Sequence, residues 1–412
     1  MKRYILVFPI AALAASAVFG QSLLELQRDF ITPQPQHKPT IIWQWMDGLV
    51  TKDGVTRDLE AFKEAGLAGV QNFQIGGPQQ SQVGNPDMPI GGDRWKDMLR
   101  YTLDECERLG LTFGTHNCPG WTSSAHPAVE PKYSMQKLVF TETKVTQKGD
   151  VVELLQPQVD TLWNYYEDVA VIAMPCDSVV DKRDVINLTA NFDCATGRLR
   201  LPDSVKAGMI ILRIGQTTNG KTNEAQAPES GRGLECDKMS REAVLRFWNV
   251  YPQMVLDVAG RHAGKTFRNF EVDSYEAGGQ TWSVVLPDEF QRRCGYDLLP
   301  FLPLMVERCK QIGTSEETRR FRNDWQNTVR QLFAENYYGY LAELVSRTPG
   351  MTLMIEPYGT GSQKPFQVID FRRILAAAPG AEIATEVWTE PATWGWKDMV
   401  KHEAVMRNLQ RP

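Results

Sequence analysis

The feature that most constrains the fold is a regular alternation of strand-like and helix-like segments near the N-terminus. Strand-like apolar runs cover residues 39–48, 67–75 and 111–117. Helical periodicity covers residues 55–66 and 94–109 between them, and Gly66 and Gly110 stand where these helices would end. Strands separated by single helices are typical of parallel sheets, because a parallel pair needs a long crossover connection. The alternation therefore predicts an α/β fold.

The middle of the chain follows a different pattern. Strand-like runs at residues 138–145, 169–174 and 209–213 are separated by segments with little helical periodicity. Residues 216–233 are rich in Gly, Asn, Thr and Ser, as expected of a domain boundary. We interpret residues 135–235 as a β-sandwich-like insertion that follows the third strand of the α/β domain.

The strand and helix alternation then returns. Helices are predicted at residues 240–263, 287–295, 316–345, 368–378 and 398–409, and strands at 267–276, 351–358 and 382–388. The α/β part thus has six predicted strands, whereas a closed (β/α)8 barrel of the TIM type has eight. We expect such a barrel, incomplete at its C-terminus: residues 21–134 form its first part, and residues 236–412 form a truncated continuation.

Composition and the N-terminus exclude several classes of protein. The formal net charge of −5 gives no basic field for nucleic acid. The seven Cys residues are scattered without a C-x-x-C, which argues against a disulfide framework or a zinc site. Residues 1–20 have a basic start, a short apolar run and a small-residue end, which predicts a signal peptide and a periplasmic or secreted bacterial protein. This run is too short for a membrane span, and no other run is apolar enough. The oligomeric state is not indicated.

Candidate site residues are the polar and aromatic side chains at the C-terminal ends of the strands, where α/β barrels carry their active sites. Carboxylates predominate, together with aromatic and amide groups, and there is no G-x-S-x-G, P-loop or G-x-G-x-x-G motif. In glycoside hydrolysis one carboxylic acid protonates the leaving oxygen, and a second carboxylate activates water or attacks the anomeric carbon. Three residues are candidates for these catalytic roles: Glu276, Glu356 and Glu386. Nine are candidates for sugar binding: Trp45, Asp47, His116, Asn117, Trp121, Asp273, Tyr275, Tyr358 and Trp388.

Several of these residues also have a purely structural interpretation. His116 fits a core histidine at least as well as a ligand for hydroxyls, and Asp273 fits a salt-bridged barrel interior equally well. Any single Trp is more often core than sugar-stacking surface. Glu276 precedes a loop of Ala and Gly, where burial would raise the carboxyl pKa and suit a general acid.

The sequence resembles glycoside hydrolase family 106, the secreted bacterial α-L-rhamnosidases. The resemblance rests on WQWMDG at residues 43–48 with VTRDLE at 55–60, GLTFGTHNCPGW at 110–121, DSYE at 273–276 with Trp282, and GYDLLP at 295–300. It implies a (β/α)8 catalytic domain interrupted by β-structure, hydrolysis with inversion, and a calcium ion near the sugar hydroxyls whose ligands are unknown. It also implies that Glu276 is the general acid and a Glu on a later strand is the base, with Glu386 the first candidate and Glu356 the reserve.

Two other functions remain open at the level of sequence. One is a glycosidase for a different sugar on the same scaffold, because no spacing in the chain selects a 6-deoxy sugar. The other is a carbohydrate-binding protein without catalysis. The sequence also does not distinguish retention from inversion at the anomeric carbon. Retention needs the two carboxyl groups about 5–5.5 Å apart and inversion needs them about 6.5–9.5 Å apart, and a sequence does not give this distance.

Overall fold

The centre of the fold is a six-stranded sheet with the order β1-β2-β3-β14-β16-β17, in which all neighbours are parallel. The structure is a computed structural model that describes residues 23–76, 88–146, 151–223, 226–273, 275, 277–356 and 369–384. The strands are β1 (Thr40–Met46), β2 (Gly69–Ile75), β3 (Thr112–His116), β14 (Phe267–Val272), β16 (Thr352–Ile355) and β17 (Glu382–Ile383). The predicted parallel α/β sheet is confirmed. Within the described residues no pairing joins β1 to β17, so closure into a barrel stays a prediction.

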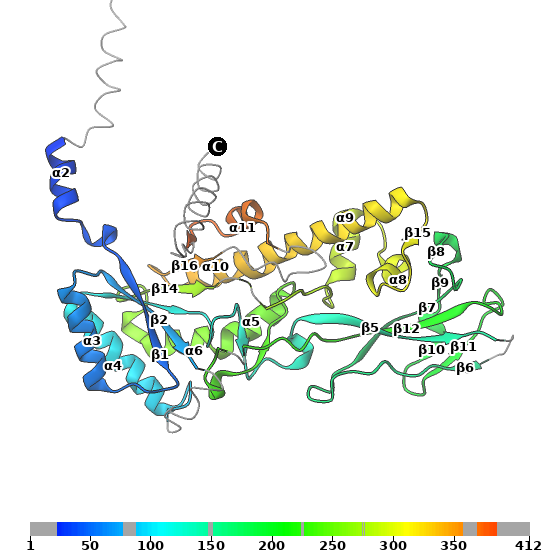
Figure 1. Ribbon diagram of the computed structural model, residues 1–412, viewed down its shortest axis with the longest axis horizontal. Coiled ribbons are helices and arrows are strands. Elements are labelled where there is room, and N and C mark those ends of the chain that lie inside the picture. The colour runs from blue at the N-terminus through cyan, green and yellow to red at the C-terminus, as the bar shows by residue number, and fades with distance from the viewer. Residues whose placement is uncertain are drawn as a thin grey trace, which may run out of the picture.

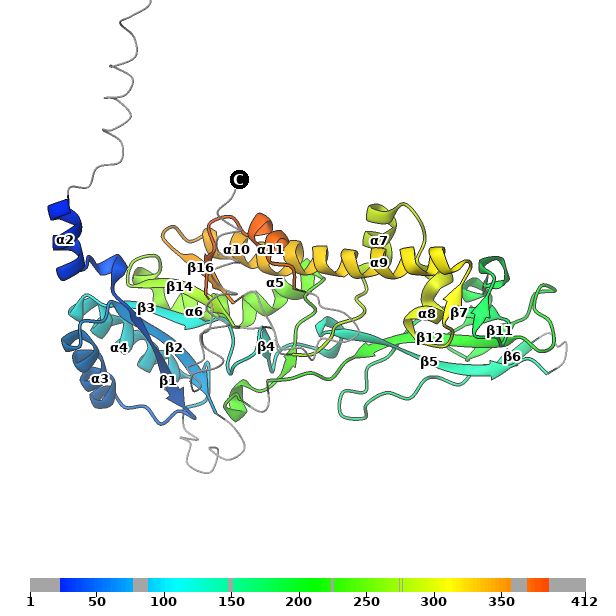
Figure 2. The same ribbon diagram turned by 45° about the horizontal axis from the view of Figure 1, so that its top comes forward.

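Helices connect these strands and cover one face of the sheet. α3, α4 and α6 lie along it (Figure 1, Figure 2). The Trp43 indole donates from Nε1 to Asp58 of α3 at 3.0 Å, which fixes the first helix against the first strand. α4 ends at Gly110, whose φ of 63° is the left-handed conformation that glycine adopts readily. The helices are α2 (Leu23–Ile31), α3 (Lys52–Glu64), α4 (Asp93–Leu109), α5 (Arg241–Val250), α6 (Pro252–Ala259), α7 (Leu286–Cys294), α8 (Leu302–Met305), α9 (Ser315–Leu332), α10 (Gly339–Ser346) and α11 (Phe371–Ala377).

Two of the long predicted helices differ in detail. The segment predicted as one helix over residues 240–263 is two helices, α5 and α6, because Pro252 has no N–H and disfavours helical backbone at Tyr251. The segment predicted over residues 316–345 is continuous from α9 to α10, with a π-helix (Phe333–Tyr338) between them. The π-helix places Tyr337 in the core, where its hydroxyl donates to the carbonyl of Ser123 at 2.8 Å.

The β-rich insertion extends from the α/β part as two small antiparallel sheets (Figure 1). One sheet has the order β5-β12-β7-β9, and the other has the order β10-β11-β6. A separate apolar cluster that includes Val171, Leu199 and Ile211 gives this region its own core. The strands here and in the adjoining loops are β4 (Ala125–His126), β5 (Gln136–Lys144), β6 (Val151–Glu153), β7 (Glu167–Met174), β8 (Val179–Val180), β9 (Ile186–Asn187), β10 (Phe192–Asp193), β11 (Arg198–Arg200), β12 (Ile210–Thr218), β13 (Leu234–Glu235) and β15 (Gln311–Ile312).

Several expectations about the chain ends lie beyond the described residues. The predicted signal peptide at residues 1–20 and the predicted helix at 398–409 both fall there. In the described part of the chain, no helix combines the length and the apolar character that crossing a bilayer requires. The seven Cys residues all lie in the described part of the chain and are free thiols there.

Candidate active site

The strand register brings three predicted positions to one edge of the sheet. Glu271 of β14 stands opposite His116 of β3 and opposite Met354 of β16. The chain continues in register past the strand ends, since the Asn117 N–H donates to the Glu271 carbonyl at 2.8 Å and the Glu356 N–H donates to the Val272 carbonyl at 2.9 Å. Neighbouring strands lie about 4.8 Å apart, so Asn117, Asp273 and Glu356 occupy adjacent positions.

Three carboxyl groups at this edge are buried. Glu271, Asp273 and Glu356 expose only 4%, 6% and 7% of their surface. Burial of a carboxyl group favours its neutral form, whereas a neighbouring hydrogen-bond donor favours the carboxylate. A set of buried carboxyl groups on adjacent strands is the kind of arrangement that acid–base catalysis by paired carboxyl groups requires.

Asp47 lies at the same edge of the sheet, directly after β1. The residue that packs against its side chain, Gly76, has no room for a Cβ atom. Its N–H donates to the Ile75 carbonyl at 2.8 Å, and its backbone has a φ of 46°. A Cβ on Gly76 would lie 2.1 Å from Asp47 Oδ1 and 2.7 Å from the Cα of Pro228. The segment that contains Pro228 therefore rests on the site edge, and Gly76 allows its close approach.

Replacing Gly76 by Ala is expected to displace Asp47 and to lower the free energy of unfolding by about 1–3 kcal/mol, the usual cost of overpacking. Urea unfolding of the two proteins measures this change. Gly54→Ala, on α3, is the control, because its new methyl group would meet only the Thr51 hydroxyl at 3.1 Å. Equal losses in the two variants would contradict the role given to the Gly76 contact.

An aromatic cluster packs beside the carboxyl groups. Phe73 of β2 stacks on the His116 ring at 5.2 Å between centroids, and Trp121 lies 4.7 Å from Phe73 at an angle of 31°. Trp121 is half-buried, so part of its indole remains available to the apolar face of a sugar.

The two ring nitrogens of His116 are both used inside the protein. Nδ1 lies 2.6 Å from the carbonyl of Cys118, and Nε2 accepts from the backbone N–H of Asp273 at 3.4 Å. This pattern fixes the neutral tautomer with the proton on Nδ1. Burial lowers the pKa of His116 to about 4. The histidine therefore joins the ends of β3 and β14, in line with its structural interpretation.

Two of the predicted sugar-binding aromatics lie in the core. Trp45 is 1% exposed and points to the same face of β1 as Trp43, whose ring packs on Phe62 of α3. Tyr275 is fully buried, and its hydroxyl donates to the Gly278 carbonyl. The structure does not bring these two side chains to an exposed surface of the site, because strand alternation and the inward turn of the loop direct them into packing.

The second strand contributes structural amides. Asn72 donates to the Trp43 carbonyl at 3.2 Å. Gln74 donates to the Asn72 side-chain oxygen at 2.6 Å and accepts from the Trp95 indole at 3.0 Å.

Four predicted site residues lie outside the described residues: Glu276, Tyr358, Glu386 and Trp388. The structure describes Tyr275 and Ala277 on either side of Glu276, and both are buried.

The structure adds charged residues that sequence analysis did not select. Glu235, Asp237 and Lys238 are buried behind the loops that follow β3 and β14. Burial raises the pKa of Asp237 to about 6. Their only signal in the sequence is three charges within four residues at the end of the insertion, a pattern that solvated loops share.

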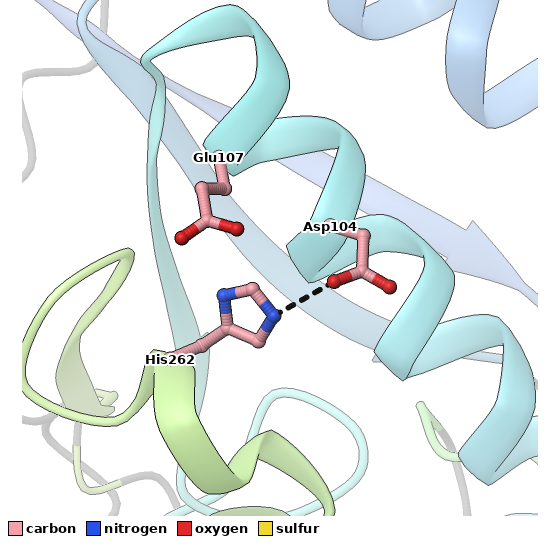
Figure 3. A group of neighbouring side chains, drawn as sticks. All are labelled: Asp104, Glu107 and His262. Carbon is pink, nitrogen blue, oxygen red and sulfur yellow. Dashed lines mark hydrogen bonds and ion pairs between the residues drawn. The ribbon is translucent and has the colours of Figure 1, made fainter.

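A second group of ionisable residues lies at the opposite edge of the sheet, near the starts of β3 and β14. Figure 3 shows Asp104 and Glu107 of α4 facing His262, and the His262 Nε2 lies 3.0 Å from Asp104. Their potential ligand atoms lie within 4.8 Å of one another. Arg261 pairs with both carboxylates, at 2.8 and 2.7 Å, so one of their two negative charges is already compensated. We interpret this group as a contact between α4 and the turn before β14.

The comparison that decides the family is a match to the sequence profile of the alpha-L-rhamnosidase family Glyco_hydro_106, over residues 31–162 and 159–408. The chain belongs to this family. The predicted resemblance to glycoside hydrolase family 106 is thereby confirmed.

Two individual proteins are similar to this family 106 chain. The structure of a rhamnosidase from Novosphingobium sp. PP1Y matches with a TM-score of 0.71 and 22% identity, over 86% of this chain and 49% of the other, which supports the shared fold. A protein from Formosa agariphila named "Putative beta-glucuronidase" is 33% identical over an alignment of 395 residues, which covers 86% of this chain and 32% of that protein. The chain thus spans about a third of the length of this curated relative.

Proposed function

We propose that this protein is a secreted glycoside hydrolase that removes terminal α-L-rhamnose from a polysaccharide or glycoconjugate with inversion. The observation that carries the proposal is the pair of buried carboxyl residues, Asp273 and Glu356, at adjacent strand ends in a member of the rhamnosidase family. Glycoside hydrolysis uses a pair of carboxyl groups that flank the scissile bond, and the buried carboxyl residues at this edge of the sheet support a site of that kind.

The proposed division of labour follows the order of the strands. Glu276 protonates the leaving oxygen as general acid. Glu386, or Glu356 in its place, takes a proton from the attacking water as general base. Asn117 and Asp273 bind sugar hydroxyls, and Trp121 packs on the apolar face of the ring.

A calcium ion is part of the proposal, because the described oxygen donors suit it. Ca²⁺ prefers carboxylate and amide oxygens. The Asn117 Oδ1 atom is buried and accepts no hydrogen bond within the described part of the chain, and Asp273 and Glu356 offer carboxylates at the adjacent positions. Bound there, calcium would supply positive charge that holds sugar hydroxyls. Asn117 and Asp273 are the ligands that we propose, and Glu356 joins them where Glu386 is the base.

A second candidate function is hydrolysis of a uronic acid glycoside, which the name of the Formosa agariphila relative favours. A uronic acid differs from rhamnose by a carboxylate, so its recognition needs a cation that a 6-deoxy sugar does not use. The two candidates therefore predict opposite preferences on paired substrates.

The test is hydrolysis of p-nitrophenyl α-L-rhamnoside and p-nitrophenyl β-D-glucuronide by the natural full-length protein, with calcium and with a chelator. We expect release from the rhamnoside, reduced by the chelator, and NMR of the first-formed sugar is expected to show the inverted anomer. Preference for the glucuronide would replace rhamnose with the second candidate. Sugar binding without turnover would instead identify a non-catalytic binding protein.

A further inference from the structure

We propose that the buried ion pair between Glu235 and Lys238 is the positioning element of the active site, holding the exit loops of β3 and β14 in one relative arrangement. This inference rests on the proposed function for its catalytic consequence. Neither residue touches the positions assigned to the sugar, so their action is indirect.

The pair is completely removed from solvent. The Lys238 Nζ lies 2.6 Å from Glu235 Oε2, and both side chains are 0% exposed. The second carboxylate oxygen, Glu235 Oε1, is buried without a hydrogen-bond partner in the described part of the chain. The pair therefore bears a large desolvation cost with incomplete hydrogen-bond compensation.

Glu235 holds the exit loop of β3. Its Oε2 accepts from the backbone N–H of Ser124 at 3.0 Å, and the N–H of Cys236 donates to the Ser124 carbonyl at 3.0 Å. The Ser124 hydroxyl in turn accepts from the Asn117 amide at 3.1 Å. The position of Asn117, a proposed sugar and calcium ligand, thus depends on Glu235 through Ser124.

Lys238 holds the exit loop of β14. Its ammonium group lies 5.4 Å from the ring centre of Tyr275 and 5.3 Å from that of Tyr337, a cation–π contact with each. Its backbone N–H donates to Gln280 Oε1 at 3.1 Å. Tyr275 immediately precedes Glu276 in the chain, so the lysine fixes the loop that carries the proposed general acid.

Stability alone does not account for two charges at this position. Replacing a buried ion pair by apolar residues of similar volume is often neutral or stabilising, whereas removing one partner is strongly destabilising. The charged groups instead fix the orientation of the two loops relative to each other. The Glu235 carboxylate accepts from one backbone N–H, and the Lys238 ammonium group contacts two aromatic rings, so both contacts form in one arrangement of the loops. An apolar pair would fill the same volume without specifying that arrangement.

The experiment compares Lys238→Met with the double variant Glu235→Gln/Lys238→Met in the natural full-length protein. Thermal unfolding, kcat on the rhamnoside, and hydrogen exchange over residues 117–124 and 275–283 are measured for each. The matched control is Asp168→Asn/Arg213→Met, which removes an ion pair in the insertion whose side chains are 21% and 6% exposed.

We expect Lys238→Met to lose stability and the double variant to recover most of it. The double variant is still expected to show faster exchange in both loops and a kcat lowered about 10- to 100-fold, the scale of a small misplacement of catalytic groups. The control is expected to leave kcat and exchange in the two loops unchanged.

Each outcome decides a separate claim. A double variant with unchanged kcat and loop exchange would overturn the positioning role. A wild-type protein without turnover would defeat the proposed function, and faster loop exchange in the double variant would then still support the positioning role. Where the double variant does not fold, Lys238→Arg replaces it with the same readouts, because it keeps both charges and changes the geometry of the pair.

Discussion

Glu276→Gln is expected to lower kcat on a rhamnosyl disaccharide by about 10²–10⁴-fold, the usual contribution of general acid catalysis. The loss on p-nitrophenyl rhamnoside is expected to be much smaller, because p-nitrophenolate leaves with little protonation. The amide keeps the size of the carboxyl group and cannot deliver its proton, so KM is expected to change little. Steady-state kinetics on the two substrates measures the difference.

Replacing the proposed base is expected to lower the rate on both substrates, unlike replacing the proposed acid. Water activation is needed whatever the leaving group is, so Glu386→Gln, or Glu356→Gln if Glu356 is the base, is expected to slow both substrates by similar factors. Glu382→Gln is the matched control, since Glu382 is exposed at the start of β17 and accepts from Thr352 at 3.0 Å. Equal losses on both substrates for Glu276→Gln would contradict its assignment as the acid.

Stability on the acid side is expected to depend on His116. Its pKa falls from 6.5 to about 4 because the folded protein buries it. Between these values the unfolded chain binds more protons than the folded protein does. The contribution is therefore present above pH 6.5 and is lost as the pH falls towards 4, by a total of about 3 kcal/mol.

Urea unfolding at pH 5 and pH 7.5, for wild type and His116→Gln, measures this dependence. Asp237 acts in the opposite direction, because burial raises its pKa to about 6 and its ionisation costs stability as the pH rises. The difference between the two proteins isolates His116, and His37→Gln, at an exposed position, is the control. An unchanged pH dependence in His116→Gln would show that this histidine does not carry the acid sensitivity.

The strands and helices of the sheet were largely predictable because each carries a local signal. The strand predicted over residues 67–75 appears as Gly69–Ile75, and the helix predicted over residues 94–109 appears as Asp93–Leu109. Hydrophobic periodicity and the glycine stop at Gly110 act over a few residues, so one segment suffices to recognise them. Pro252 is also a local signal, for the end of one helix and the start of the next. The prediction of a single helix over residues 240–263 followed the apolar periodicity on both sides of it instead.

The site was predictable only as a set of positions. Sequence identifies which residues end the strands, and parallel register then brings Asn117, Asp273 and Glu356 to one edge. The direction of each side chain depends on packing across the sheet. Trp45 is therefore buried against Trp43, whose ring packs on Phe62 of α3, and His116 uses both nitrogens inside the protein.

The sequence by itself determined the parallel α/β order and the family, because these rest on local periodicity and on motifs read along the chain. Only the tertiary structure decided that Glu235 and Lys238, at the end of the insertion, pair in full burial behind two loops from distant strands. Burial and pairing are properties of groups that meet in space, and three charges in a short segment have the same appearance whether solvent or protein surrounds them.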